Sequence, residues 1–401
     1  MSTLPLNKSE TFVYDICQRS FLSLWCYNNP QGKGGKELCD ILVVCDPHVI
    51  IVSVKEVALK GENQAAEFGK WTRKAVDASI KQLYGAARWL ASSSQVIRSN
   101  GSPGLSLPSV AVRKVHRIAV AFGGQGEVPI SSGDFGKGLV HVMSETSFHE
   151  VLTELDTITD LVDYLAALEV CASSGCTMIV EGSESNLLGW YLSNDRSFPK
   201  GQDLMILDDT IWQGLQEKPE FKRRKEADRD SYFWDRLIEG LSDPNAKPIG
   251  EAGAELSEFE LALRVMACEP RFHRRALGRH AHEFFEQAKA RKLRSRILNS
   301  PSGVIYVLVF FSDNEDLDYQ GAELGARCFI ARHRMGRGDT VIGVGIGKHI
   351  PGKGSVSTLC YVKCPNWSAA DDEQAIKMKG SMGFFATPTI RHSHEDEYSA
   401  G

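Results

Sequence analysis

Two short runs of apolar and β-branched residues, separated by a tight turn, constrain the fold of this chain more than any other feature. Residues 38–45 (LCDILVVC) and 49–54 (VIIVSV) have the composition of buried strands. Asp46-Pro47-His48 between them favours a turn. We therefore expect two adjacent strands that pair within an N-terminal sheet.

Helical periodicity on both sides of this pair predicts an α/β fold. Apolar residues recur at three- and four-residue steps from Ser9 up to the Asn28-Asn29-Pro30 segment, and again over residues 64–90. Further strands are expected at VHRIAVAFGG and GKGLVHVMS, followed by a helix over residues 148–170. This alternation is typical of a mixed sheet flanked by helices.

The length of 401 residues and the changes in composition indicate several domains. We expect an α/β domain over residues 1–200 and a charged helical region over residues 201–300. Residues 301–401 are expected to form a small α/β domain, because strand-like runs flank a helical segment there.

Composition predicts a cytoplasmic globular protein. The net charge is −5, and hydrophobic residues make up 42% of the chain, so a large core can form but the whole chain is not basic. The ten cysteines include no CxxC pair, which favours buried thiols in a reducing compartment. The first residues lack a signal-peptide pattern, and no apolar stretch approaches the roughly 20 residues that span a bilayer. We expect no membrane partner.

Charged residues interrupt the two buried runs. Asp40 stands in the first run, and Lys55 directly follows the second. Buried charges are costly unless they are paired, bind a metal or take part in chemistry. Glu37 just precedes Asp40, and Ser53 shares a strand face with Lys55. Carboxylates there could bind Mg²⁺ and the lysine could offset charge at a phosphodiester; a purely structural ion pair is the alternative.

The spacing ELCD-x12-SVK resembles the active-site signature of the PD-(D/E)xK nucleases, which have the restriction-endonuclease-like fold. In that family an acid on one strand is followed by a strand that carries acid-x-Lys. Asp40 matches the first acid and Lys55 the lysine. The resemblance covers about residues 8–125, and implies a restriction-endonuclease-like mixed sheet flanked by helices.

The resemblance also implies an activity. It predicts a Mg²⁺-dependent (or Mn²⁺-dependent) endonuclease that hydrolyses phosphodiester bonds, with DNA favoured over RNA. By analogy such a protein would act in bacterial antiviral defence or DNA processing, as a homo-oligomer or within a complex. Glu10 matches a metal-binding acid on the preceding helix, and Gln82 or Lys81 a polar residue on the following helix.

The chain departs from the family at Ser53, which stands where the second acid is expected. A serine hydroxyl is a weak neutral ligand. Three explanations are open. Glu37, or less readily Glu56, supplies the missing carboxylate; the Val54 carbonyl and water complete the metal shell; or the domain has lost catalysis and serves as a binding module or a subunit of a complex.

A basic segment near residue 280 is the second candidate. Residues 261–298 hold ten Lys and Arg against three Glu. We expect a surface that tracks phosphates, with a helical face neutralised by acidic segments as the alternative. The candidate nucleic-acid contacts are Arg271, Arg274, Arg275 and Arg279.

Overall fold

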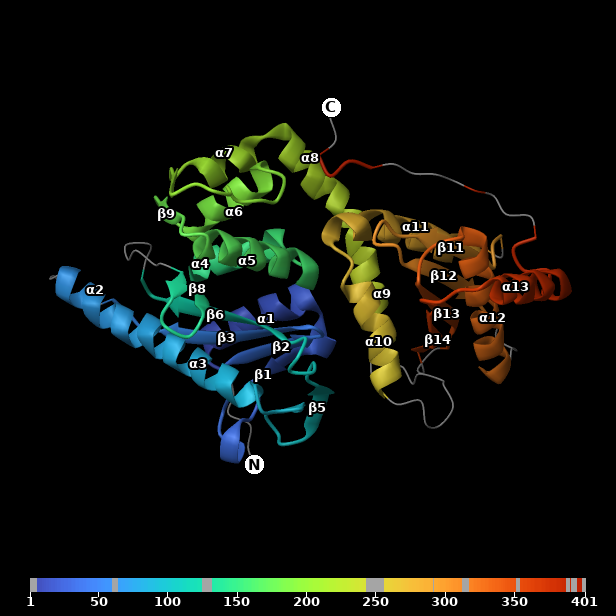
Figure 1. Cartoon of the computed structure of the whole chain (residues 1–401), viewed down its shortest axis with the longest axis horizontal. Helices are drawn as coiled ribbons and strands as arrows, with labels where there is room; N and C mark the ends of the chain where they lie inside the picture. The colour runs from blue at the N-terminus through green and yellow to red at the C-terminus, as the bar shows by residue number, and fades with distance from the viewer. Residues whose placement is uncertain are drawn as a thin grey trace. The chain divides into compact units, whose positions relative to one another are not determined.

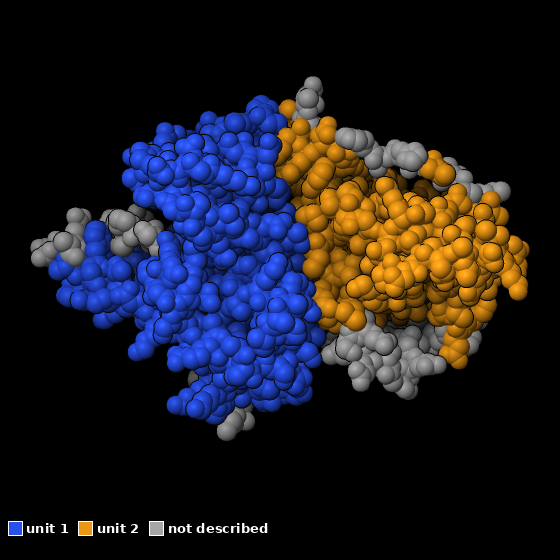
Figure 2. Space-filling view, in the orientation of Figure 1, with its two compact units in different colours: residues 1–222 blue, residues 223–401 orange. Residues whose placement is uncertain are grey.

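The structure is a computed structural model that describes most of the chain. The described residues are 6–59, 64–124, 132–242, 256–290, 292–311, 317–350, 354–386, 390 and 395–398. They form a mixed α/β protein, as predicted, with two compact units, residues 1–222 and 223–401 (Figure 2). The expected division at residues 200 and 300 stays a prediction, since the residues assigned to its middle region are shared between the two units.

A six-stranded mixed sheet forms the centre of the first unit, with the strand order β1-β2-β3-β6-β8-β7. Its strands are β1 (Cys26–Asn28), β2 (Ile41–Cys45), β3 (His48–Glu56), β6 (Lys114–Phe122), β7 (Gly133–Asp134) and β8 (Leu139–Ser144). Strands β3, β6 and β8 run parallel, whereas β1, β2 and β7 pair antiparallel with their neighbours. The predicted pairing of the two apolar runs is confirmed, although β2 begins one residue after Asp40.

Helices cover both faces of this sheet. On one face lie α2 (Gln64–Thr72), a π-helical turn (Arg73–Asp77) and α3 (Ala78–Leu90), which continue one another as a single rod (Figure 1). Ser53 contacts Gln82 of α3, whereas Glu56 contacts Ser9 of α1 (Lys8–Phe21). Because residues 53 and 56 point to opposite sides of a strand, α1 and α3 cover opposite faces.

Three segments of the first unit differ from the prediction. Helix α1 ends at Phe21, because Leu22 adopts a positive φ of 67°, and residues 26–28 form the edge strand β1. The helix expected over residues 148–170 is two helices, α4 (Glu145–Glu154) and α5 (Ile158–Ser173), and the Thr157 side chain caps the second. The loop expected after α3 contains a short hairpin, β4 (Gln95–Ile97) and β5 (Pro103–Ser106).

The remainder of the first unit is largely helical. It contains α6 (Glu184–Ser193), α7 (Ile211–Glu217) and the two-stranded parallel sheet of β9 (Thr177–Val180) and β10 (Leu204–Leu207). Helix α8 (Pro219–Ala227) carries the chain across the boundary between the units.

The second unit is built on a four-stranded sheet with the order β11-β12-β13-β14. Its elements are α9 (Tyr232–Ser242), α10 (Leu256–Ala267), α11 (Arg271–Lys289), β11 (Ser295–Asn299), β12 (Ile305–Phe310), α12 (Leu317–Met335), β13 (Thr340–Ile350), β14 (Gly354–Lys363) and α13 (Ala369–Met382). Strands β12 and β13 are parallel and are joined through α12. Apolar residues of β12, β13 and α12 are fully buried together in its core. Within the described part of the chain, no helix has the length and apolar character required to cross a bilayer.

Candidate functional site

Asp40 and Lys55 meet at one edge of the first sheet. Asp40 directly precedes β2 and Lys55 lies near the end of β3. Because these strands are antiparallel, the start of one meets the end of the other. Oδ2 of Asp40 accepts the backbone N–H of Val54 at 2.7 Å and lies 3.4 Å from Nζ of Lys55. The Asp40 side chain is 3% exposed and that of Lys55 32%, so the ammonium group reaches solvent.

Two further acids lie near this pair. The pKa of Glu37 is raised, chiefly by desolvation of its carboxyl group. The negative charge of Asp40, a hydrogen bond with Asp40 and the charge of Glu10 raise it further. The Lys55 ammonium group partly offsets this effect. Glu10 also closes the N-terminal capping box of α1 with Asn7. Glu37 and Asp40 from the segment before β2, Lys55 of β3 and Glu10 of α1 therefore lie near one another.

The Glu37 and Asp40 carboxyl groups fit a hard divalent cation. In the described parts of the chain, no group of three or more His, Cys, Asp and Glu side chains is already arranged to hold a metal ion. Glu37 and Asp40 instead lie in hydrogen-bonding contact with each other, so two potential oxygen ligands are adjacent. Mg²⁺ commonly binds through one or two carboxylates and keeps several waters, which matches this pair beside solvent.

The structure distinguishes between the two glutamates that could replace the missing acid. Glu56 accepts a hydrogen bond from the Ser9 hydroxyl group, on the side of the sheet that α1 covers. Glu37 is the acid that contacts Asp40. Ser53 is fully buried, and its hydroxyl group donates to Oε1 of Gln82 at 2.8 Å. Gln82 therefore lies beside the predicted site residues, whereas Lys81 is exposed.

Three of the four candidate arginines are buried inside the second unit. Arg271 and Arg274 of α11 both donate to the carboxylate of Asp235, and Arg275 donates to Asp228 at 2.8 Å. These guanidinium groups are neutralised internally and do not face solvent. The prediction that they contact nucleic acid finds no support in this arrangement.

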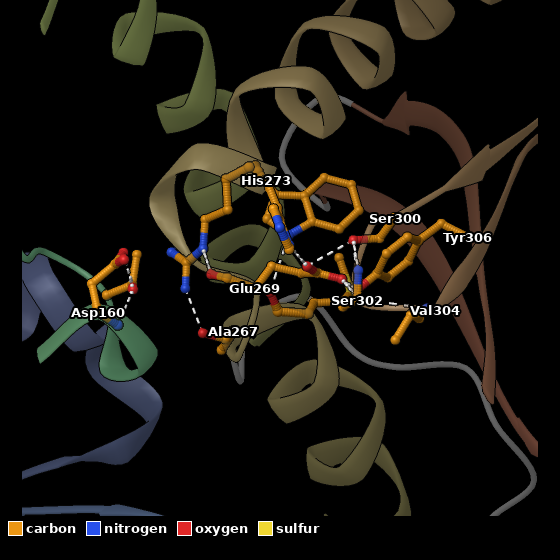
Figure 3. A network of polar contacts seen from close by, with 12 residues as sticks. Asp160, Ala267, Glu269, His273, Ser300, Ser302, Val304 and Tyr306 are labelled. Carbon is orange, nitrogen blue, oxygen red and sulfur yellow. Dashed lines mark hydrogen bonds and ion pairs between the residues drawn. The ribbon is translucent and has the colours of Figure 1, made fainter. Parts of the chain in front are cut away.

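The turn before α11 is also fixed by buried polar contacts. Arg274 Nε donates to the backbone oxygen of Glu269 at 2.8 Å. The carboxylate of Glu269 accepts hydrogen bonds from Ser300, Ser302 and Tyr306 and contacts His273, as Figure 3 shows. Arg279, the fourth candidate, has a side chain that is 36% exposed and pairs with Asp230 and Glu395. This segment is a packing core in which arginines and acids balance.

A row of histidines on three adjacent strands was not predicted from the sequence. His48 Nδ1 of β3 lies 3.1 Å from His116 Nε2 of β6, and His141 Nε2 of β8 lies 3.4 Å from Oε1 of Glu169 on α5. Nδ1 of His116 lies 3.7 Å from the same Glu169 oxygen. The sequence shows histidines within apolar, strand-like segments. It does not show that these strands are neighbours in the sheet, so the contact between the histidines could not be predicted.

Comparisons with protein-family models, curated proteins and solved structures found no match to this chain. A function is therefore inferred from the geometry around Asp40.

Proposed function

We propose that this protein is a metal-dependent nuclease that hydrolyses phosphodiester bonds of nucleic acid, with DNA favoured over RNA. The observation that carries the proposal is the meeting of Glu37, Asp40 and Lys55 at one edge of the sheet. Paired acids beside a lysine provide cation ligands and a positive group for the phosphate at the same place.

Each residue has a separate role in this proposal. Asp40 and Glu37 would hold Mg²⁺ or Mn²⁺, and Glu10 would add negative charge nearby. When bound, the cation supplies charge neutralisation at the phosphate and lowers the pKa of a bound water. Lys55 reaches solvent and would contact a phosphate oxygen or orient the attacking water. The bound cation would favour the ionised form of Glu37.

A second candidate is a nuclease-like module that binds without cutting. Ser53 is buried against Gln82 where the family carries an acid, and Asp40 is tied to the backbone of Val54. Both contacts would also serve a purely structural role. This candidate predicts that nucleic acid binds and is not cleaved.

Cleavage assays on the full-length chain separate the two candidates. Plasmid, linear duplex DNA, single-stranded DNA and RNA would each be incubated with Mg²⁺, Mn²⁺ or EDTA. The nuclease proposal predicts cleavage that needs the divalent cation and is lost in Asp40→Asn, which keeps the shape of the side chain. Cleavage that persists in Asp40→Asn, or none with any substrate, would count against it.

A further inference from the structure

We infer that an open cavity beside the Asp40 site binds an unpaired nucleobase, so that the substrate is single-stranded or locally opened nucleic acid. The inference rests on the proposed function and specifies the form of its substrate. The cavity has a volume of about 490 Å³ and lies between the first turns of α1 and α4 and the end of β6.

The cavity lies near the proposed catalytic edge, to which α1 and the end of β3 connect it. Ser9 in its wall donates a hydrogen bond to Glu56, the residue that follows Lys55. Phe122, also in its wall, is paired in register with Glu56 across β3 and β6. Glu10, whose charge acts on Glu37, follows Ser9 in the same turn of α1. Because Lys55 and Glu56 point to opposite faces of β3, a strand held at Asp40 and Lys55 would pass around this end of the sheet to reach the cavity.

Aromatic rings give the cavity a surface suited to stacking. The rings of Phe12 and His149 are stacked, with centroids 6.0 Å apart and an interplanar angle of 27°. Phe122 meets Phe12 edge to face at 6.0 Å. Phe12 is 40% exposed, so part of its ring surface is open to solvent. Bases stack on such rings with little dependence on their sequence.

Polar groups at the rim match the other parts of a nucleotide. Lys8 is exposed and offers a positive charge to a phosphate, and Glu145 offers a carboxylate that can accept hydrogen bonds from the amino groups of a base. In a duplex these base faces are stacked and the amino groups are paired, so only an unpaired base can use both.

Binding measured without catalysis tests the inference. A fluorescent single-stranded oligonucleotide and its blunt duplex would be titrated with the full-length chain in EDTA, with fluorescence anisotropy as the readout. We expect tighter binding of the single strand. Phe12→Ala and His149→Ala should each weaken it about tenfold, because one stacked base is worth roughly 1–3 kcal/mol. Phe12→Tyr should retain it.

Phe135→Ala is the matched control, because Phe135 is also an exposed phenylalanine of the first unit, at 47%, but does not line the cavity. Three results would overturn the inference. The single strand could bind no more tightly than the duplex, the single strand could fail to bind, or both Phe12→Ala and His149→Ala could bind it with wild-type affinity. His149 is on the surface, so His149→Ala remains decisive if Phe12→Ala fails to fold. If binding depends on these rings but no cleavage is found, only the nuclease proposal is overturned. If cation-dependent cleavage is found but binding does not depend on the rings, only this inference is overturned.

Discussion

The Lys55 ammonium group lies 3.4 Å from Oδ2 of Asp40, the same oxygen that accepts the Val54 N–H at 2.7 Å. The backbone of β3 thus orients the acid toward the lysine of that strand. Because Asp40 is buried and Lys55 is partly exposed, the pair has one fixed member and one member able to reach a substrate. This asymmetry underlies the predictions for the site.

Glu37→Gln should separate stability from cation binding. Desolvation and the charges of Asp40 and Glu10 raise the pKa of Glu37, so its charged form is unfavourable in the folded state. The stability that its protonated form provides is lost as pH rises from the usual carboxyl range through the raised pKa. At pH 7 the neutral amide should therefore raise the free energy of unfolding slightly, because Glu37 is exposed and solvent screens the repulsion. The melting temperature of Glu37→Gln should rise much less with increasing Mg²⁺ than that of wild type. An equal rise in both proteins would show that Glu37 is not a ligand of the cation.

Ser53→Glu would restore the acid of the PD-(D/E)xK pattern at a fully buried position. Without metal, a larger charged side chain against Gln82 should destabilise the first unit by about 2 kcal/mol or more. If residue 53 faces the cation, Mg²⁺ should recover more stability in Ser53→Glu than in wild type. Ser53→Gln, similar in size but neutral, is the control, and an identical Mg²⁺ response in both variants would show that residue 53 does not face the cation.

The histidine row predicts that the first unit loses stability in mild acid. Burial, the electrostatic interaction with His116 and the positive charge of Lys114 lower the pKa of His48 to about 4. Burial also lowers the pKa of His141, together with His116 and Arg117, against the opposing hydrogen bond with Glu169. The unfolded chain therefore takes up more protons between pH 6.5 and pH 4, and stability falls as pH decreases through that range.

Urea unfolding at pH 7.5, 6 and 5 would measure this effect. We expect His48→Phe to lose less stability between pH 7.5 and 5 than wild type, by about 1–2 kcal/mol. Glu169, whose pKa is lowered to about 2 by hydrogen bonds with His116 and His141 that outweigh its desolvation, adds a further loss only below about pH 4.5. His149→Asn on the surface should follow wild type; an unchanged slope in His48→Phe would exclude His48 as the source.

Arg274→Met should destabilise the second unit, because Arg274 is 1% exposed and shares Asp235 with Arg271. Removing one partner of a buried ion pair costs about 3–5 kcal/mol. Arg229→Ala, which removes an exposed pair with Glu226, should change the free energy of unfolding by less than about 1 kcal/mol. Equal effects in chemical denaturation would contradict the buried role of Arg274.

Local features of the fold could be predicted from sequence, but long-range pairing could not. The hairpin of β2 and β3 and the rod over residues 64–90 follow from β-branched runs and helical periodicity. The position of β6 beside β3 depends on pairing between residues that are far apart in the sequence, such as His48 with Lys114, and such pairing leaves no local pattern. Strand β1 was missed because apolar spacing continues past Phe21, whereas the backbone turns at Leu22.

In the candidate functional sites, too, contacts between residues close in sequence could be predicted and long-range contacts could not. The sequence predicted that Asp40, Lys55 and Glu37 would lie close together, because all three belong to one hairpin and the residues just before it. Three of the four candidate arginines of α11 are buried rather than on a surface, which the sequence could not show because a local charge count ignores acids elsewhere in the chain. Their partners Asp228 and Asp235 precede them by 47 and 36–39 residues.

The rate of cation-dependent cleavage by Lys55→Met, measured at enzyme excess alongside its melting temperature, distinguishes a catalytic lysine from a structural one. A partly exposed ion pair contributes about 0–1 kcal/mol, so Lys55→Met should remain folded with nearly the wild-type melting temperature. If Lys55 acts on the phosphate or the attacking water, the rate should fall by about 10² or more. Cleavage by Lys55→Met at the wild-type rate, with stability lost instead, would show that the Asp40–Lys55 pair only supports the fold.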